Sequence, residues 1–224
     1  MTASWVVPSD DDPTERPRGW LEGTRCDAWI VHTSLDDPLA TAAAWNRESP
    51  PEQLDERLDR WLAYYGERKI EAVGYGAFVL RRRDAGSNWI RTCVVPRSGI
   101  HSAGTHLERL FAAQDFLGSL DDEELGRQRF RLHEDARLEH SLRPTEGGWN
   151  LEGAELVLID GLPFRAGLDE ATSAIVHRLG PTMPLTVILA DAAAELGADA
   201  GRFQPAGLEF VKQLLELGYV VPES

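Results

Sequence analysis

The stretch EAVGYGAFVLRRR, residues 71–83, decides the fold of the first part of the chain. Its triplet Gly74-Tyr75-Gly76 has the G-x-G spacing with which a nucleotide-binding loop begins. Such a loop works because a strand stops and a helix N-terminus starts, which aims backbone N–H groups at the anion. Here the apolar run continues past Gly76 into three arginines, and Val79 occupies the place of a third glycine. We therefore predict a strand whose two glycines lie on one flat face and admit a closely packed neighbour.

Buried strands and helix starts precede this stretch. The apolar runs ASWVV (3–7) and CDAWIVHTSL (26–35) predict two strands, and the second lacks a polar face, as expected for a strand covered by helices on both sides. One helix is predicted between them. A second is predicted after the cap Asp37, and a third starts at Ser49, with Glu52 completing a capping box. This alternation is typical of an α/β unit.

The rest of the chain changes texture. Segment 96–128 has the spacing of amphipathic helices, with Ser119 as the cap of the second one. From residue 129 the pattern has a period of two, which predicts one half-buried strand over RFRLHEDARLEHSLRP, residues 129–144. After a turn at GGWNLEG, the run AELVLIDG predicts its antiparallel partner. Residues 168–221 carry three helix patterns, the first opened by Asp169, and a terminal strand follows. Three helices with short strands suggest a winged-helix-like module.

The charge of the chain argues against nucleic acid as a partner. The formal net charge is −14, from 23 basic and 37 acidic residues, and such a surface repels a phosphate backbone. The part from residue 150 onward carries eleven acids against Arg165, Arg178, Arg202 and Lys212. Its last helix offers only Lys212 and Gln213 to a groove, so we expect a protein-docking or architectural role for the winged-helix-like part.

Composition also bounds the class of protein. Cys26 and Cys93 give neither a disulfide framework nor a zinc-ligand spacing. No apolar run approaches the roughly 20 residues of a membrane helix, and no signal-like segment opens the chain, so we expect a cytoplasmic protein. The basic cluster Arg81–Arg83, with Arg91 and Arg97 nearby, is predicted to be a strand end exposed to solvent.

Four neighbouring residues have the chemistry of metal ligands, namely His133, Glu134, Asp135 and His140. Odd and even positions of a strand face opposite ways, so the two histidines would diverge. At most one of them can belong to any single site. We assign no metal site here.

The remaining histidines give no catalytic constellation. His101 and His106 lack a third ligand and are predicted at the surface, whereas His32 lies in an apolar strand and is predicted to be buried and hydrogen-bonded. No serine lies in a G-x-S-x-G elbow, and neither cysteine has a histidine at a suggestive spacing.

Two acidic runs and one aromatic cluster have ordinary explanations. The runs Asp10–Asp12 and Asp121–Glu124 fit helix starts and solvated faces, and Trp61, Tyr64 and Tyr65 fit core packing. The sequence thus leaves the catalytic residues unknown and assigns no cofactor-binding or metal-binding residue.

The order of the elements resembles the C-terminal portion of a bacterial class I S-adenosylmethionine-dependent methyltransferase, of the type related to HemK and small-domain enzymes. The resemblance covers nearly the whole chain and has no short diagnostic motif. It implies that 3–7, 26–35 and 73–83 are the fifth, sixth and seventh strands of a Rossmann-like sheet, with the seventh antiparallel between the other two. The words that carry it are ASWVV, RGWLEGTRCDAWIVHTSLDDP, RLDRWLAYYGERKIEAVGYGAFVLRRR, FRLHEDARLEHSLRP, LVLIDGLPFRAGLDEAT and LLELGYVVP.

The sequence departs from that family where the cofactor binds. These enzymes carry a glycine-rich loop after the first strand, an acidic residue at the end of the second and, in HemK-like members, an Asn-Pro-Pro-Tyr segment after the fourth. None of these occurs here. The resemblance therefore implies S-adenosylmethionine for the complete enzyme and no cofactor bound by this chain alone. It implies a role in substrate positioning or partner binding, not catalysis by the chain alone. The alternative is a non-catalytic protein–protein interaction scaffold.

Three segments are expected: a partial methyltransferase-like α/β unit at 1–95, a helical connector at 96–128, and a β-hairpin plus winged-helix-like α+β domain at 129–224. Without a cofactor-binding half, the fifth strand is an exposed edge, and such edges recruit partners. We therefore expect a homodimer, or pairing with a separate cofactor-binding polypeptide.

Overall fold

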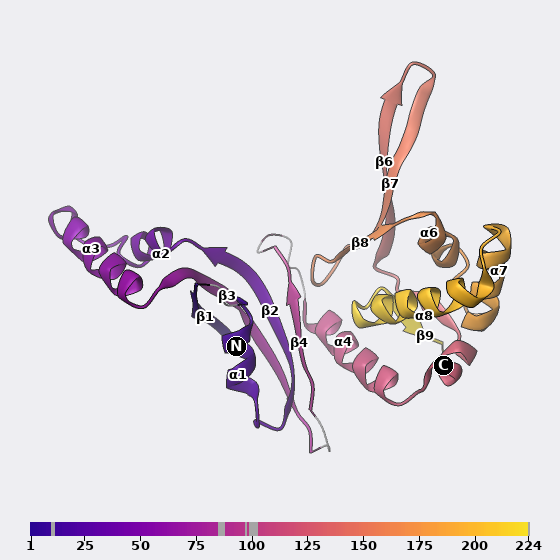
Figure 1. Cartoon of the computed structure of the whole chain (residues 1–224), viewed down its shortest axis with the longest axis horizontal. Helices are drawn as coiled ribbons and strands as arrows, with labels where there is room; N and C mark the ends of the chain where they lie inside the picture. The colour runs from indigo at the N-terminus through magenta and orange to yellow at the C-terminus, as the bar shows by residue number, and fades with distance from the viewer. Residues whose placement is uncertain (10–11, 85–87, 97, 99–102, 224) are drawn as a thin grey trace. The chain divides into compact units, whose positions relative to one another are not determined.

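The computed structural model describes residues 1–9, 12–84, 88–96, 98 and 103–223. The predictions that fall on Asp10, Asp11, Arg97 and His101 lie outside these residues. The chain divides into two units, Met1–Ser98 and Gly99–Ser224, and both combine helices with β-sheets (Figure 1). Segment 96–128, expected as a connector, falls almost wholly in the second unit.

The first unit is built on a four-stranded sheet with the order β1-β3-β2-β4. Its strands are β1 (Thr2–Pro8), β2 (Cys26–Asp36), β3 (Ile70–Arg82) and β4 (Ile90–Val94). Strand β3 is antiparallel to both β1 and β2, while β4 runs parallel to β2. The stretch that carries the G-x-G triplet is therefore a strand, as predicted, and it lies between the two strands that precede it in the chain.

The two glycines of β3 make room for an indole ring. A Cβ atom at Gly74 would lie 2.6 Å from Cε2 and Nε1 of Trp5, and one at Gly76 would lie 2.9 Å from Cη2 of the same ring. At Gly76 the added atom would also run into the carbonyl oxygen of Val31 on β2. The Trp5 Nε1–H donates to the carbonyl oxygen of Pro13, which fixes the ring in place. The predicted close approach at this face is confirmed, and the neighbour is Trp5.

Helices cover both faces of the sheet. They are α1 (Glu15–Leu21), α2 (Pro38–Trp45) and α3 (Pro51–Glu67). Leu21 of α1 packs with Trp5 and Ile30 on one face, and Tyr65 of α3 packs with Val73 on the other. Helix α1 packs against β1 and β2, and α2 and α3 pack against β3.

The two predicted helix caps in this unit have different outcomes. Asp37 caps α2 as predicted, because its carboxylate accepts from the backbone N–H groups of Leu39 and Ala40. Ser49 does not cap α3: Pro50 takes that position without a side-chain bond, and the Ser49 hydroxyl accepts from Arg57 instead. A proline at the helix start needs no cap for its missing N–H.

The prediction of a solvent-exposed strand end at Arg81–Arg83 holds for Arg82, whereas Arg81 and Arg83 are half-buried against Asp27. Asp27 at the start of β2 is fully buried, and its Oδ2 lies 2.8 Å from Nη2 of Arg81 and 3.0 Å from Nε of Arg83. Its Oδ1 accepts from Asn88 and from the Trp89 backbone N–H. Burial alone would raise the pKa of Asp27, but the bonds from Arg81, Asn88 and Trp89, together with the charge of Arg83, lower it below its ordinary value.

We expect Asp27→Asn to cost the first unit about 2 kcal/mol at pH 7, because the substitution removes one partner of a buried ion pair while both arginines keep some contact with water. Because the folded pKa of Asp27 is depressed, its contribution is present above the unfolded value of about 3.9 and is lost as pH falls below it. Urea unfolding followed by tryptophan fluorescence at pH 7 and pH 3 measures both effects. A variant difference that stays the same at both pH values would contradict this account, and the exposed Asp59→Asn is the matched control.

The second unit contains two further sheets and a set of helices. Its elements are α4 (Ala103–Gly118), α5 (Asp122–Arg127), β5 (Phe130–Leu132), β6 (Ala136–Thr145), β7 (Gly148–Leu158), β8 (Arg165–Leu168), α6 (Glu170–Val176), α7 (Leu185–Glu195), α8 (Ala200–Glu216) and β9 (Val220–Pro222). One sheet pairs β5 with β9, and the other has the order β6-β7-β8. The fully buried side chains come from helices and strands alike, including Leu110, Phe130, Leu156, Ile188, Leu214 and Tyr219.

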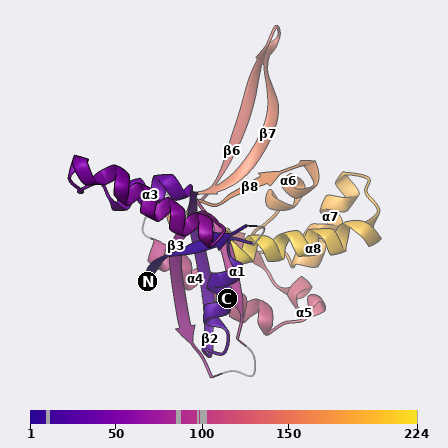
Figure 2. The same ribbon diagram turned by 60° about the vertical axis from the view of Figure 1, so that its left-hand side comes forward.

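The prediction of a single strand over residues 129–144 is wrong. The chain turns at His133–Asp135 and splits it into β5 and β6, which pair with different strands. Of the following stretch GGWNLEG (147–153), predicted as a turn, Gly147 lies in the turn but 148–153 belongs to β7, so the hairpin of β6 and β7 is longer than expected. In both views this hairpin extends well beyond the helices of its unit (Figures 1 and 2).

The two predicted helix caps of the second unit have different outcomes. Asp169 caps α6 in a box with Thr172, as predicted. The cap of α5 is Asp121, in a box with Glu124, and not Ser119, whose hydroxyl donates to the carbonyl oxygen of Phe116. Within the described part of the chain, no helix is both long and apolar enough to cross a bilayer.

Candidate functional site

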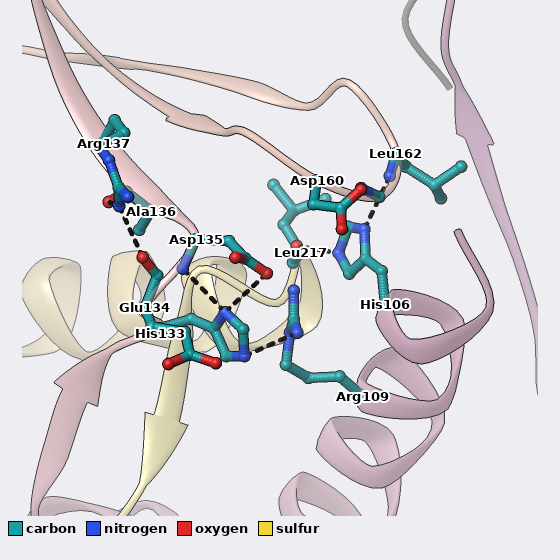
Figure 3. Close-up of polar contacts among 11 residues, drawn as sticks. His106, Arg109, His133, Glu134, Asp135, Ala136, Arg137, Asp160, Leu162 and Leu217 are labelled. Carbon is teal, nitrogen blue, oxygen red and sulfur yellow. Dashed lines mark hydrogen bonds and ion pairs between the residues drawn. The ribbon is translucent and has the colours of Figure 1, made fainter. Parts of the chain in front are cut away.

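Two histidines, an arginine and an aspartate gather beside α4 (Figure 3). His106 on this helix was predicted at the surface, but its side chain is buried, with 2% exposed. The backbone N–H of Leu162 donates to its Nδ1 at 2.9 Å, and its Nε2 lies 2.9 Å from the carbonyl oxygen of Leu217. This pattern fits the neutral ring with its proton on Nε2. Burial lowers the pKa of His106 to about 4, although the bond to Leu217 opposes the shift.

Two glycines with positive φ enclose this ring. Gly161 has φ +103° and Gly218 has φ +75°, and a Cβ atom on either would lie within 2.7 Å of the imidazole. Glycine tolerates such backbone angles without steric cost. The ring thus ties α4 to the loop after β7 and to the end of α8.

His133 forms the second part of the group. An Nη1–H of Arg109 donates to its Nε2 at 2.8 Å, so the ring proton belongs on Nδ1. Nδ1 lies 3.3 Å from Oδ2 of Asp135 and 3.2 Å from the Asp135 backbone nitrogen. Because arginine can only donate, Nε2 is the acceptor, so Nδ1 carries the proton and donates it to the carboxylate, and the Asp135 N–H cannot donate to Nδ1 at the same time. Burial, followed by the charge of Arg109, lowers the pKa of His133 even though Asp135 opposes the shift.

The cluster of His106, Arg109, His133 and Asp135 has a structural role. A general base needs a free lone pair that a substrate can reach. Both nitrogens of His106 are bonded to the backbone, and the lone pair of His133 is taken by Arg109. The cluster fixes α4 against the turn between β5 and β6. Neither imidazole has a free nitrogen that could accept a proton from a substrate.

The other predicted candidates are scattered. His140 lies on β6, apart from the turn that holds His133, and among the described residues no group of three or more His, Cys, Asp or Glu side chains could hold a metal ion. His32 is buried as predicted. Its Nε2 has no hydrogen-bond partner in the described part of the chain, so the predicted hydrogen bond is wrong for that atom. Burial raises the pKa of the Cys93 thiol to about 12, which removes it as a nucleophile.

The aromatic cluster is mostly core, as predicted. Tyr65 is buried, and its ring meets that of Trp61 edge-on with centroids 5.7 Å apart. Tyr64 does not fit the prediction, because it is 51% exposed and lies under the guanidinium of Arg68.

A comparison of the sequence with known protein families gives a match to the second part of the chain. Residues 108–222, just over half of the chain, match the family described as a domain of unknown function, DUF7782. The chain belongs to the DUF7782 family. The DUF7782 segment begins within α4 and ends in β9, so it takes in Arg109, His133 and the long hairpin. No curated protein matches the chain.

Because the imidazole nitrogens of the polar cluster are bonded within the protein, the candidate functional sites are two exposed surfaces. One is the outer edge of β1, which has no strand beside it among the described residues. The other is the far half of the hairpin, where Leu142, Trp149 and Leu151 are 52%, 68% and 59% exposed. The hairpin surface lies inside the DUF7782 segment. The sequence signal for this surface is the spacing of two positions between Leu142 and Pro144 and between Trp149 and Leu151, which places each pair on one face of its strand.

Proposed function

We propose that this chain supplies the last strands of a class I methyltransferase sheet, with an accessory domain that positions the substrate or binds a partner. The observation that supports this is the order of β1, β3 and β2, in which β3 lies antiparallel between two earlier strands, although β4 beside β2 has no counterpart in the resemblance. The resemblance implies this arrangement for its fifth, seventh and sixth strands. Helices on both faces of the sheet support the same assignment.

The edge of β1 is suited to pairing. Met1 exchanges both backbone hydrogen bonds with Phe78 on β3. In an antiparallel ladder bonded and non-bonded pairs alternate, so the backbone groups of Thr2, Ser4 and Val6 point away from β3. In a complete methyltransferase sheet a fourth strand would take these groups.

The chain's own residues do not fit S-adenosylmethionine. The connection from β1 to α1 and the one from β2 to α2 contain no glycine-rich turn at which a helix N-terminus could receive the cofactor. We therefore derive no methyl-transfer step from this chain. Cofactor binding belongs to the half that would pair with β1.

The accessory domain combines α6, α7 and α8 with short strands, which supports a winged-helix-like assignment. Its cations do not form a phosphate-binding face. Lys212 of α8 lies 2.7 Å from Asp122, and Arg165 bonds both Glu139 and Glu155. These pairings favour a protein-binding role over a nucleic-acid one.

The test is cofactor titration followed by reassembly. We expect no heat when S-adenosylmethionine is titrated calorimetrically into the folded chain. Binding should appear once the chain is combined with a half that carries a glycine-rich loop and an Asn-Pro-Pro-Tyr segment, encoded directly upstream in the same or the adjacent reading frame. Saturable binding by this chain alone would overturn the proposal.

Ser4→Pro sharpens the test at the β1 edge. Proline removes the outward N–H of Ser4, which β3 does not use, and an edge strand tolerates it. We expect unchanged circular dichroism of the chain alone but at least a tenfold loss of assembly, whereas Ser4→Ala should assemble normally. Light scattering detects the alternative of a homodimer through the same edge, which Ser4→Pro would also dissociate. Assembly that survives Ser4→Pro would remove the β1 edge from the proposal.

The second candidate is the interaction scaffold, and the exposed hairpin favours it. If no cofactor-binding half is encoded beside the chain, the hairpin surface remains as the functional part of the molecule.

A further inference from the structure

The hairpin of β6 and β7 has one face that is apolar along its length except at His140. Directly opposed residues of an antiparallel pair share a face. The pairs on this face are Leu138 with Leu156, His140 with Ala154, Leu142 with Leu151, and Pro144 with Trp149. Leu156 and Ala154 at the base are buried, whereas the distal pairs are exposed. Exposed apolar residues that continue a buried stripe mark a binding surface more often than single exposed ones do.

A groove of about 870 Å³ opens beside this face. Its hairpin side includes Leu151 and Ala154, and Leu168 of β8 lies opposite Ala154 in the ladder. Its other side is formed by α6 and the end of α7. The volume is within the range of ligand-binding clefts. Because Leu151 belongs to both, the groove and the exposed hairpin face form one continuous surface.

The rim of the groove is acidic. Glu152, Asp169, Glu170 and Glu195 line it, and Glu152 is already paired with Arg143 of β6. The lining contains one arginine, Arg178, which is already paired with Glu195 and donates to the carbonyl oxygen of Ala174. A ligand that enters therefore meets an apolar floor and an excess of negative charge. This excludes phosphate-rich ligands and favours cations beside an apolar group.

We infer that the groove and the distal hairpin bind a basic segment of another protein, in which large apolar side chains alternate with arginine or lysine. The apolar side chains lie on Leu151 and Ala154, and the cations face Glu170 and, in competition with Arg143, Glu152. A second copy of the chain is a poor occupant, because each copy carries a net charge of −14 and would present its own acidic rim. The inference names the partner class for the partner-binding role proposed above and rests on that role.

The experiment is fluorescence anisotropy with a fluorescein-labelled peptide of twelve residues in which arginine and leucine alternate. Two matched peptides replace arginine by glutamate or leucine by serine. We expect the arginine–leucine peptide to bind the whole chain with a dissociation constant on the order of 10 µM in low salt, and both matched peptides to bind at least tenfold more weakly. Equal binding of the serine peptide would show charge attraction without the apolar surface and overturn the inference.

Variants locate the site. Leu151→Ser, and separately the double variant Glu152→Gln with Glu170→Gln, should each weaken binding at least fivefold, because these exposed side chains provide the two kinds of contact. The exposed acids Glu108 and Glu134 lie outside the groove, and their double glutamine variant should leave binding unchanged. Equal losses in both double variants would overturn the inference, as would a concentration-dependent dimer that Leu151→Ser dissociates. Neither cofactor nor the second half of a methyltransferase enters this measurement, so its failure is distinct from failure of the proposed function.

Discussion

Gly76→Ala is expected to unfold the first unit or to cost it at least about 3 kcal/mol, which is the upper end for added methyl groups in packed cores. The added Cβ would run into the Val31 carbonyl oxygen, which is backbone and is held in the ladder between β2 and β3. The entropy gained by replacing glycine in the unfolded chain is worth at most about 1 kcal/mol and cannot offset this clash. Urea unfolding followed by tryptophan fluorescence reports on this unit, because six of the seven tryptophans lie in it.

Two comparisons make the result specific. Gly66 in α3 has no atom within 4 Å of an added Cβ, so Gly66→Ala should be neutral or stabilise by up to about 1 kcal/mol. At Gly74 the clash is with the Trp5 side chain alone. Trp5→Leu should therefore rescue part of the loss in Gly74→Ala but not in Gly76→Ala, as a double-mutant cycle would show. Equal rescue at both positions would contradict the assigned clash with Val31.

Sequence pattern predicted the first unit well because its signals are local. The strand character of 71–83, the flat face at Gly74 and Gly76, and the cap at Asp37 follow from neighbouring residues. The partners of the glycines do not, since Trp5 and Val31 are brought to β3 only by the order of the sheet. The same limit applies to Asp27, which is joined to Arg81 and Arg83 across more than 50 positions.

The second unit shows how a periodic pattern can mislead. The alternation from residue 129 onward is continuous, yet the chain turns at His133–Asp135 because Phe130 pairs toward β9 and Leu138 toward β7. His106 was misplaced for a related reason. A lone histidine next to a helix start has no local signal of burial, and its two bonding partners, at Leu162 and Leu217, are 56 and 111 positions away. The hairpin surface was missed because glycines beside Trp149 are typical of turns.

The buried ring of His106 makes the stability of the second unit depend on pH. The folded pKa, about 4, lies below the unfolded value of 6.5, so between these limits the unfolded chain binds more protons. The stabilisation is fully present above pH 6.5 and is lost as pH falls toward 4. The full effect is about 3 kcal/mol, of which roughly 2 kcal/mol is lost between pH 7 and pH 5. His133, whose pKa is also lowered, adds in the same direction.

His106→Gln should cost about 3 kcal/mol at pH 7, because the Leu162 N–H and the Leu217 carbonyl oxygen lose a matched partner inside the core. The variant should also lose most of the pH dependence, so that it and the wild type converge near pH 4. Hydrogen-exchange pulse labelling of α4 and α8 after equilibration in urea, with the label always applied at one pH, measures this for the second unit alone. His133→Gln is the matched comparison, since it should retain the part of the slope that belongs to His106. If the stability of His106→Gln had the same pH slope as that of the wild type, the His106 ring would have to bind protons equally well in the folded and unfolded states. That result would contradict its role as a buried neutral ring that joins α4 to the end of α8.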